Sequence, residues 1–111
     1  MDCIFCKIIA NEIPSTKVFD SERLIVIEDI SAQAPTHLLV IPKKHYDSIL
    51  DCDDDLFMTE AIAAARELSK KYKVDEKGFR LVINTNEEGG QTVFHLHMHI
   101  IGGRQLTGQM G

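Results

Sequence analysis

The stretch His95-Leu96-His97-Met98-His99-Ile100-Ile101 alternates imidazole and apolar side chains without a break. Successive side chains of a β-strand point to opposite faces, so a strand here would place all three imidazoles on one face and Leu96, Met98 and Ile100 in the core. A rise of about 3.3 Å per residue would separate neighbouring rings by roughly 7 Å. The pattern therefore predicts a row of ring nitrogens on a rigid strand.

Three interpretations of this row compete. The first is an exposed strand that carries histidines by chance, and the second is a metal site, because two histidines at i, i+2 of a strand can share one zinc ion. The third is nucleophilic catalysis, in which a neutral imidazole attacks phosphorus. The preceding Gly89-Gly90-Gln91-Thr92 offers glycines that permit close backbone approach and a hydroxyl, which suits an oxyanion or phosphate better than a cation. We therefore favour catalysis on a phosphate.

The rest of the chain supplies the other elements of a sheet. Helical spacing of apolar residues predicts a short helix over 4–9, and a longer amphipathic helix follows Asp53-Asp54-Asp55, whose carboxylates suit a helix start. Runs rich in β-branched residues predict strands at 17–20, 24–29, 37–41, 79–84 and 93–101. We expect one α+β domain over residues 1–111, with a five-stranded, mainly antiparallel sheet, one long helix and a short N-terminal helix. The Gly-rich tail 102–111 is expected to be irregular.

The composition narrows the classes of partner and compartment. The 111 residues carry a net charge of -5 and are 44% apolar and 26% charged, which is typical of a soluble domain. Without a basic cluster, neither a nucleic acid nor a membrane surface is an expected partner, so a small anion would need local donors. No secretory signal is expected from Met1–Lys7, and we expect a cytoplasmic protein in which Cys3 and Cys6 stay reduced.

With these motifs in view, the chain resembles the histidine triad (HIT) family, whose signature of three histidines alternating with apolar residues is matched in full by 95–101. Further stretches resemble the Hint branch of that family: 5–9, 13–14, 29–30, 34–45, 89–93 and 102–105. The resemblance covers nearly the whole chain. It implies hydrolysis of purine nucleoside 5'-phosphoramidates to nucleoside monophosphates through a covalent nucleotidyl-histidine.

The resemblance also implies roles for individual residues. His97 would be the nucleophile, His99 would contact the phosphate and assist proton transfer, and His37 and His95 would orient the imidazoles. The phosphate donors would be Thr92, Gly90 with its neighbour Gln91, and Asn84, while Asp29 would accept from the ribose hydroxyls. The base would lie in an apolar slot formed by Ile4, Phe5, Ile8, Ile27 and Ile30, although each of these is as well explained as ordinary core.

Cys3 and Cys6 resemble a subset of the family in which a Cys-x-x-Cys pair and two histidines hold a structural zinc. The implied ligands here are Cys3, Cys6, His45 and His95, a Cys₂His₂ set, whereas two free thiols are the alternative. No catalytic metal is expected. The resemblance also implies a homodimer.

Several alternatives stay open at this level. The pocket could serve a nucleotide-binding regulatory module with little turnover, or a hydrolase of dinucleoside polyphosphates. A zinc ion held by His95, His97 and His99 is a further possibility. The sequence does not identify the preferred base or the natural leaving amine.

Overall fold

The computed structural model describes residues 2–111. Its helices are α1 (Ile4–Ile9) and α2 (Asp55–Lys71), with a single 3₁₀ turn at Ile49–Asp51. Its strands are β1 (Lys17–Asp20), β2 (Leu24–Glu28), β3 (Thr36–Pro42), β4 (Phe79–Val82) and β5 (Met98–Gly102). The strands form one sheet in the order β1-β2-β3-β5-β4, and every neighbouring pair is antiparallel. The predicted fold class is thus confirmed.

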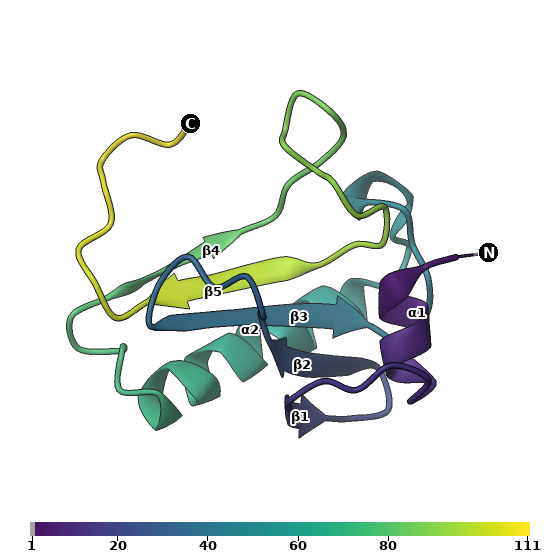
Figure 1. The fold of residues 1–111 in the computed structure, drawn as a ribbon, viewed down its shortest axis with the longest axis horizontal. Helices are drawn as coiled ribbons and strands as arrows, with labels where there is room; N and C mark the ends of the chain where they lie inside the picture. The colour runs from purple at the N-terminus through teal and green to yellow at the C-terminus, as the bar shows by residue number, and fades with distance from the viewer. Residues whose placement is uncertain (1) are drawn as a thin grey trace.

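The two helices cover opposite faces of the sheet, and the alternation of side chains in the strands shows why (Figure 1). In β2, Leu24 and Val26 pack in the cluster that contains α2, whereas Ile25 and Ile27 pack in the cluster that contains α1. Both faces of β2 and β3 are therefore buried. The helix α1 has only six residues, so it covers only part of the sheet face on which it packs. The part of that face around β5 stays open and borders a cleft.

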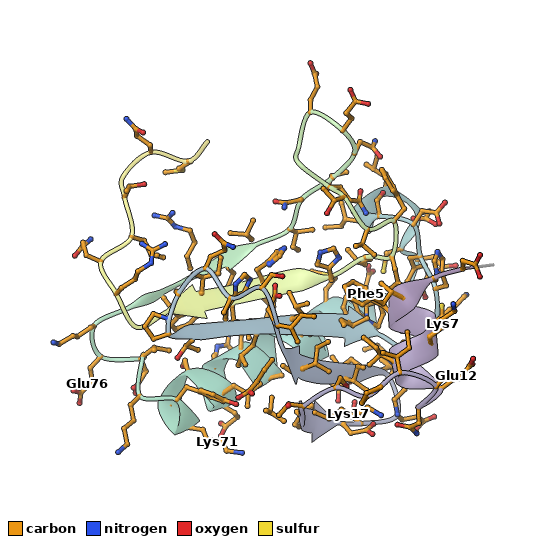
Figure 2. All side chains as sticks on the ribbon, in the orientation of Figure 1. Phe5, Lys7, Glu12, Lys17, Lys71 and Glu76 are labelled. Atoms are coloured by element: carbon orange, nitrogen blue, oxygen red, sulfur yellow. The ribbon has the colours of Figure 1, made fainter. Side chains whose placement is uncertain are left out.

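The long helix begins where the acidic run predicted. Asp54 is the N-cap, and its carboxylate accepts a hydrogen bond from the Leu56 N–H, while Asp55 lies in the first turn. Phe57, Ala61, Ala64 and Leu68 form the buried stripe of α2. Figure 2 shows Lys71 at the other end of the helix, where a positive charge faces the negative end of the helix dipole.

Replacing Asp54 by Ala should lower the free energy of unfolding by about 1 kcal/mol, because a helix N–H loses its acceptor. In thermal unfolding this corresponds to a shift of about 5 °C. Asp54 also pairs with Arg23 at 3.1 Å, so Asp54→Asn is the matched control: it keeps a capping oxygen, removes the charge and should stay close to the wild-type midpoint. An Asn variant as unstable as the Ala variant would assign the effect to the ion pair instead.

The structure corrects the predicted strand over 93–101. The β5 ladder starts only at Met98, and residues 93–97 bend away from β3 because the Leu96 N–H bonds the Tyr46 carbonyl at 2.7 Å. Leu96, Met98 and Ile100 nevertheless enter the core beside α2 as predicted. β4 ends at Val82 rather than at 84, and β2 ends at Glu28 rather than at 29.

The C-terminal segment has the irregular character that its glycines predicted. Residues 103–111 contain no helix or strand, whereas Gly102, which was also expected to be irregular, is the last residue of β5. The Arg80 guanidinium donates to the Thr107 carbonyl at 2.7 Å, and Arg104 donates to the Gln33 carbonyl at 3.1 Å, so side chains hold the tail against the body. Within residues 2–111, no helix has the length and apolar character needed to cross a membrane.

Candidate active site

A cleft of about 350 Å³ opens on the face that α1 leaves uncovered, a size within the range of small-molecule sites. The cleft brings together nine of the residues that the sequence singled out: Ile4, Phe5, Ile8, Ile27, Asp29, Ile30, Thr92, His97 and His99. Phe5, Ile8 and Ile27 form buried walls, whereas the Ile30 side chain is 99% exposed and lies at the rim. The apolar walls can accept a flat ring, and the histidines lie beside them.

His97 has its ring orientation and tautomer fixed by the backbone. Its Nδ1 lies 2.8 Å from the His95 carbonyl oxygen, which can only accept, so Nδ1 carries the proton. Phe5 packs edge-on against the ring, with centroids 5.0 Å apart; Figure 2 places this side chain on α1. Nε2 consequently keeps its lone pair, and within residues 2–111 no hydrogen bond engages it. An unprotonated ring nitrogen held in one orientation has the chemistry that a nucleophile requires.

A second histidine pair forms a hydrogen-bonded chain from the backbone to the cleft. The Gln33 N–H donates to His37 Nδ1 at 3.0 Å, so His37 carries its proton on Nε2. That Nε2–H faces His99 Nδ1 at 2.8 Å and Asp29 Oδ2 at 3.3 Å. His99 therefore accepts through Nδ1 and carries its proton on Nε2. The His99 ring is thus set up as a donor toward the cleft.

Burial favours the neutral form of the His37 and His99 rings. The pKa of His99 is lowered to about 4, first by burial and then by the neighbouring His97 and His37 rings, while Asp29 acts in the opposite direction. Burial also lowers the pKa of His37, although Asp29 partly offsets the shift. At neutral pH the His37–Asp29 contact is therefore a hydrogen bond to a neutral ring rather than an ion pair.

We expect the His99 ring to titrate near pH 4, which ¹H–¹³C NMR can follow directly. The unfolded chain binds this proton at its ordinary pKa of about 6.5, so the unfolded state holds more protons between about pH 4 and 6.5. The free energy of unfolding should therefore fall as the pH is lowered through that window. The His99 contribution should be about 1 to 2 kcal/mol after solvent screening of the partly exposed ring.

A His99→Asn variant supplies the control for this measurement. It should lack the His99 part of the pH dependence while keeping the parts due to His37 and the other groups. A His99 signal that titrates near pH 6.5 would contradict the expected neutral donor.

On the other side of His97, four side chains converge as the resemblance implied: Cys3, Cys6, His45 and His95 have ligand atoms that all lie within 4.8 Å of one another. His95 Nδ1 is 3.2 Å from Cys3 Sγ and 3.6 Å from Cys6 Sγ, and His45 Nδ1 is 3.3 Å from Cys6 Sγ. Zinc bonds of about 2.3 Å to sulfur and 2.0–2.1 Å to nitrogen require sulfur–nitrogen separations of roughly 3.5 Å in a tetrahedron. The cluster can therefore hold a Zn²⁺ ion.

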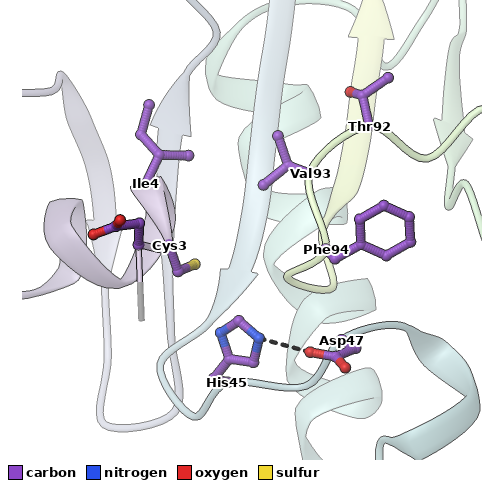
Figure 3. A pocket seen from close by; sticks show the side chains of 8 residues that line it. Cys3, Ile4, His45, Asp47, Thr92, Val93 and Phe94 are labelled. Atoms are coloured by element: carbon purple, nitrogen blue, oxygen red, sulfur yellow. Dashed lines mark hydrogen bonds and ion pairs between the residues drawn. The ribbon is translucent and has the colours of Figure 1, made fainter.

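The hydrogen bonds of the two histidines support a metal at this place. His95 Nε2 donates to the Pro42 carbonyl at 2.9 Å, and His45 Nε2 donates to Asp47 Oδ1 at 2.9 Å. Both rings therefore direct an unprotonated Nδ1 at the sulfurs, which is the tautomer that a metal needs. Figure 3 shows the His45–Asp47 bond at the edge of a hollow of about 400 Å³, with Cys3 nearby.

A second group of potential ligands, Asp29, His37 and His99, also converges within 4.8 Å, but its chemistry fits a proton better. A metal on His37 Nε2 would displace the proton to Nδ1, where it would point at the Gln33 N–H. Two donors would then face each other. The His95, His97 and His99 set does not form a ligand cluster in the described part of the chain, because His95 turns its Nδ1 to the cysteines.

The predicted phosphate donors are only partly assembled. Thr92 is exposed and lies on the wall of the cleft, whereas Asn84, Gly90 and Gln91 do not line it. Asn84 reaches the Gly90 carbonyl at 3.5 Å. The Gln91 amide instead holds its own loop, donating to the Asp47 and Val93 carbonyls and accepting from the Asn86 N–H. Gln91 thus supports the loop that carries Thr92.

The backbone conformation of this loop requires glycine at positions 89 and 90. A Cβ on Gly89 would lie 2.3 Å from the Thr85 carbonyl oxygen, and Gly90 has a φ of +81°. The close backbone approach that the sequence suggested is therefore between Gly89 and Thr85.

Sequence reasoning missed several residues of the site. Leu39, Val93 and Ser15 line the cleft, and Asp47 orients His45. A carboxylate two residues after a candidate metal-binding histidine was a readable signal for Asp47. No sequence signal points to the carbonyls of Pro42 and His95 or to the Gln33 N–H.

Comparison with known proteins agrees with this geometry. The family model of the HIT domain matches residues 10–106. The chain is 40% identical to the purine nucleoside phosphoramidase of Escherichia coli over 107 residues, 95% of this chain and 90% of the relative. It is 45% identical to an uncharacterized HIT-like protein of Chlamydia trachomatis over 108 residues, 96% of each chain.

Solved structures agree as well. A HIT family hydrolase from Legionella pneumophila Philadelphia 1 superposes with a TM-score of 0.94 at 46% identity, covering 99% of this chain and all of the other. A histidine triad protein from Clostridium difficile gives 0.90 at 44% identity, covering 98% and 96%. The chain therefore belongs to the HIT family of nucleotide hydrolases.

Proposed function

We propose that this protein hydrolyses purine nucleoside 5'-phosphoramidates, such as adenosine 5'-phosphoramidate, to the nucleoside monophosphate and an amine. The observation that carries the proposal is the tautomer of His97: its Nδ1–H is bonded to the His95 carbonyl, so an unprotonated Nε2 is available at a cleft with apolar walls. The 40% identity to the purine nucleoside phosphoramidase of E. coli supports the same substrate class.

The reaction proceeds in two displacements at phosphorus. The Nε2 lone pair of His97 attacks the α-phosphorus, a P–Nε2 bond forms, and the P–N bond to the amine breaks as the amine takes up a proton. The positive charge on the His97 ring is stabilised by the Nδ1–H bond to the His95 carbonyl. Water then attacks phosphorus and gives one proton to the solvent, which balances the proton taken up by the amine; the P–Nε2 bond breaks, and the monophosphate leaves with His97 restored.

His99 and Asp29 are placed for the polar parts of the substrate. A neutral His99 donates from Nε2 to a phosphoryl oxygen and assists proton transfer to the amine. Asp29 accepts from the ribose hydroxyls. His37 orients His99, and His95 orients His97.

The remaining donors stabilise the charge that develops on phosphorus. We assign this role to the Thr92 hydroxyl, which lines the cleft, and to the Asn84 amide and the Gly90 N–H, which would have to exchange its 3.0 Å bond to the Glu87 carbonyl for the phosphate. The purine stacks between Phe5, Ile8 and Ile27.

We further propose a structural zinc bound by Cys3, Cys6, His45 and His95, which closes the N-terminal segment onto the sheet. The reaction itself needs no metal, because the attacking nitrogen is already unprotonated. Reduced zinc-ligand cysteines suit the cytoplasm, which we propose as the compartment.

Incubation with adenosine 5'-phosphoramidate tests the function. AMP should appear, and diadenosine polyphosphates assayed side by side should be turned over much more slowly. Tight AMP binding without turnover would replace the proposal by a nucleotide-binding module. In H₂¹⁸O, one labelled oxygen should enter the phosphate of each AMP formed.

We also propose a homodimer, since β1 and β4 are sheet edges and the Gly-rich tail offers a segment that a second copy can hold. Light scattering coupled to gel filtration should give twice the chain mass of 12.5 kDa. A monomer mass at micromolar concentration would contradict it.

A further inference from the structure

The Cys₂His₂ cluster and the nucleophile are tied together by one residue. The His95 side chain contributes Nδ1 to the cluster, while the backbone carbonyl of the same residue accepts the Nδ1–H of His97 at 2.8 Å. The His95 ring is fully buried, and its other nitrogen is held by the Pro42 carbonyl. A metal bound to His95 therefore fixes the peptide group that fixes the nucleophile.

A second connection runs through α1. Cys3 is the N-cap of this helix, and its sulfur accepts the Cys6 N–H at 3.3 Å, so both thiol ligands lie in the first turn. One residue before Cys6, Phe5 packs edge-on against both His97 and His95, with centroid distances of 5.0 and 5.7 Å. A metal that holds both sulfurs thus also holds the aromatic ring that confines His97.

Without the metal, weak contacts would hold this arrangement. Thiol–imidazole hydrogen bonds are weaker than zinc bonds, and a helix of six residues is not stable on its own. The His95 ring and Phe5 would then sample other positions, and the His97 ring would lose its single orientation. Displacement of a reacting group by about 1 Å costs on the order of 10²-fold in rate.

We propose that the metal in the Cys₂His₂ cluster sets the orientation of the His97 ring, with His95 and Phe5 as positioning residues, so that metal occupancy controls turnover. The proposal rests on the proposed function for its kinetic readout. It concerns kcat more than substrate affinity, because the Cys₂His₂ ligands are not on the walls of the nucleotide cleft and, of the two positioning residues, only Phe5 is.

The Asp47→Asn variant separates the metal from the cleft. Asp47 Oδ1 accepts from His45 Nε2, and loss of such a carboxylate partner weakens metal binding about 10- to 100-fold. Asp47 does not line the nucleotide cleft. Asp53→Asn is the matched control, since Asp53 is exposed and lies 3.9 Å from Lys44 Nζ, away from the cluster.

In a series of zinc buffers, kcat for adenosine 5'-phosphoramidate should rise at least tenfold from zinc-free to zinc-saturated protein, while the Kd for AMP should fall by a smaller factor, because Phe5 is the only wall of the base slot that the metal holds in place. The Asp47→Asn variant should need 10- to 100-fold more free zinc for half-maximal kcat and reach the wild-type plateau. Asp53→Asn should follow wild type. In ¹⁵N NMR, the His97 Nδ1–H signal should appear with zinc and broaden without it.

Three results would overturn the proposal. One is an unchanged kcat on a folded, zinc-free chain, and another is a loss of kcat that coincides with the loss of helical circular dichroism, which would mean that zinc acts only through folding. The third is a His97 Nδ1–H signal that does not respond to zinc. Absence of AMP formation at every zinc concentration contradicts the proposed function instead. In that case the NMR signal still tests whether the metal orients the His97 ring.

Discussion

Replacing His97 by Ala should lower kcat for adenosine 5'-phosphoramidate by at least about 10⁴-fold, because no covalent intermediate can form without the nucleophile. Affinity for AMP should change little, since the walls of the cleft and Asp29, the proposed ribose acceptor, stay in place. Stability should fall by only about 1 kcal/mol, the typical net contribution of one hydrogen bond such as that to the His95 carbonyl. Single-turnover formation of AMP measures the loss of rate, titration calorimetry measures the affinity for AMP, and scanning calorimetry measures the stability.

Two further variants make this expectation specific. His97→Gly opens space for free imidazole, which should restore part of the turnover by taking the place of the missing ring. His99→Ala should lose much less, about 10²-fold, because a donor and proton carrier is removed while the nucleophile remains. Wild-type protein denatured at alkaline pH, where a P–N bond to histidine survives, should carry a nucleotide on residue 97 in mass spectrometry. If His97→Ala kept a tenth of the activity, the role of His97 as nucleophile would be disproved.

The sequence predicted the sheet well where burial alone decides. The apolar runs that became β2 and β3 form strands as predicted, and the predicted apolar stripe of α2 is buried, because these side chains leave water by packing in the core. The prediction was wrong at residues 93–97. There a single long-range bond from the Leu96 N–H to the Tyr46 carbonyl ends the ladder, and local side-chain alternation carries no information about it.

The residue types of the site were readable, whereas their protonation was not. Alternation and family resemblance pointed to His97, His99 and the metal cluster. Which nitrogen of each ring carries the proton is decided by backbone groups, the His95 carbonyl for His97 and the Gln33 N–H for His37. Those contacts depend on how distant segments meet. An ideal strand would place neighbouring histidine rings about 7 Å apart. The centroids of the His97 and His99 rings are instead 5.0 Å apart.

The Cys6→Ser variant should lose the metal, with zinc content falling from about one ion per chain to nearly none. A hydroxyl is a poor zinc ligand. The three remaining ligands, which are the buried Cys3 thiol, His45 and His95, would form an incomplete coordination shell. We expect the free energy of unfolding to drop by about 3 kcal/mol, or roughly 10–15 °C in the thermal midpoint, because metal binding stabilises only the folded chain.

Two control variants identify the ligand set behind this loss. Cys52 is a half-buried thiol whose Sγ lies 3.8 Å from the Asp54 carbonyl and outside the cluster, so Cys52→Ser should keep its zinc and a midpoint within about 2 °C of wild type. His97→Ala should also keep its zinc, because the His97 ring bonds the His95 carbonyl rather than the cluster. Zinc lost from His97→Ala but kept by Cys6→Ser would assign the metal to the three alternating histidines. Metal analysis by plasma mass spectrometry, on protein purified without chelators, decides between the two sites.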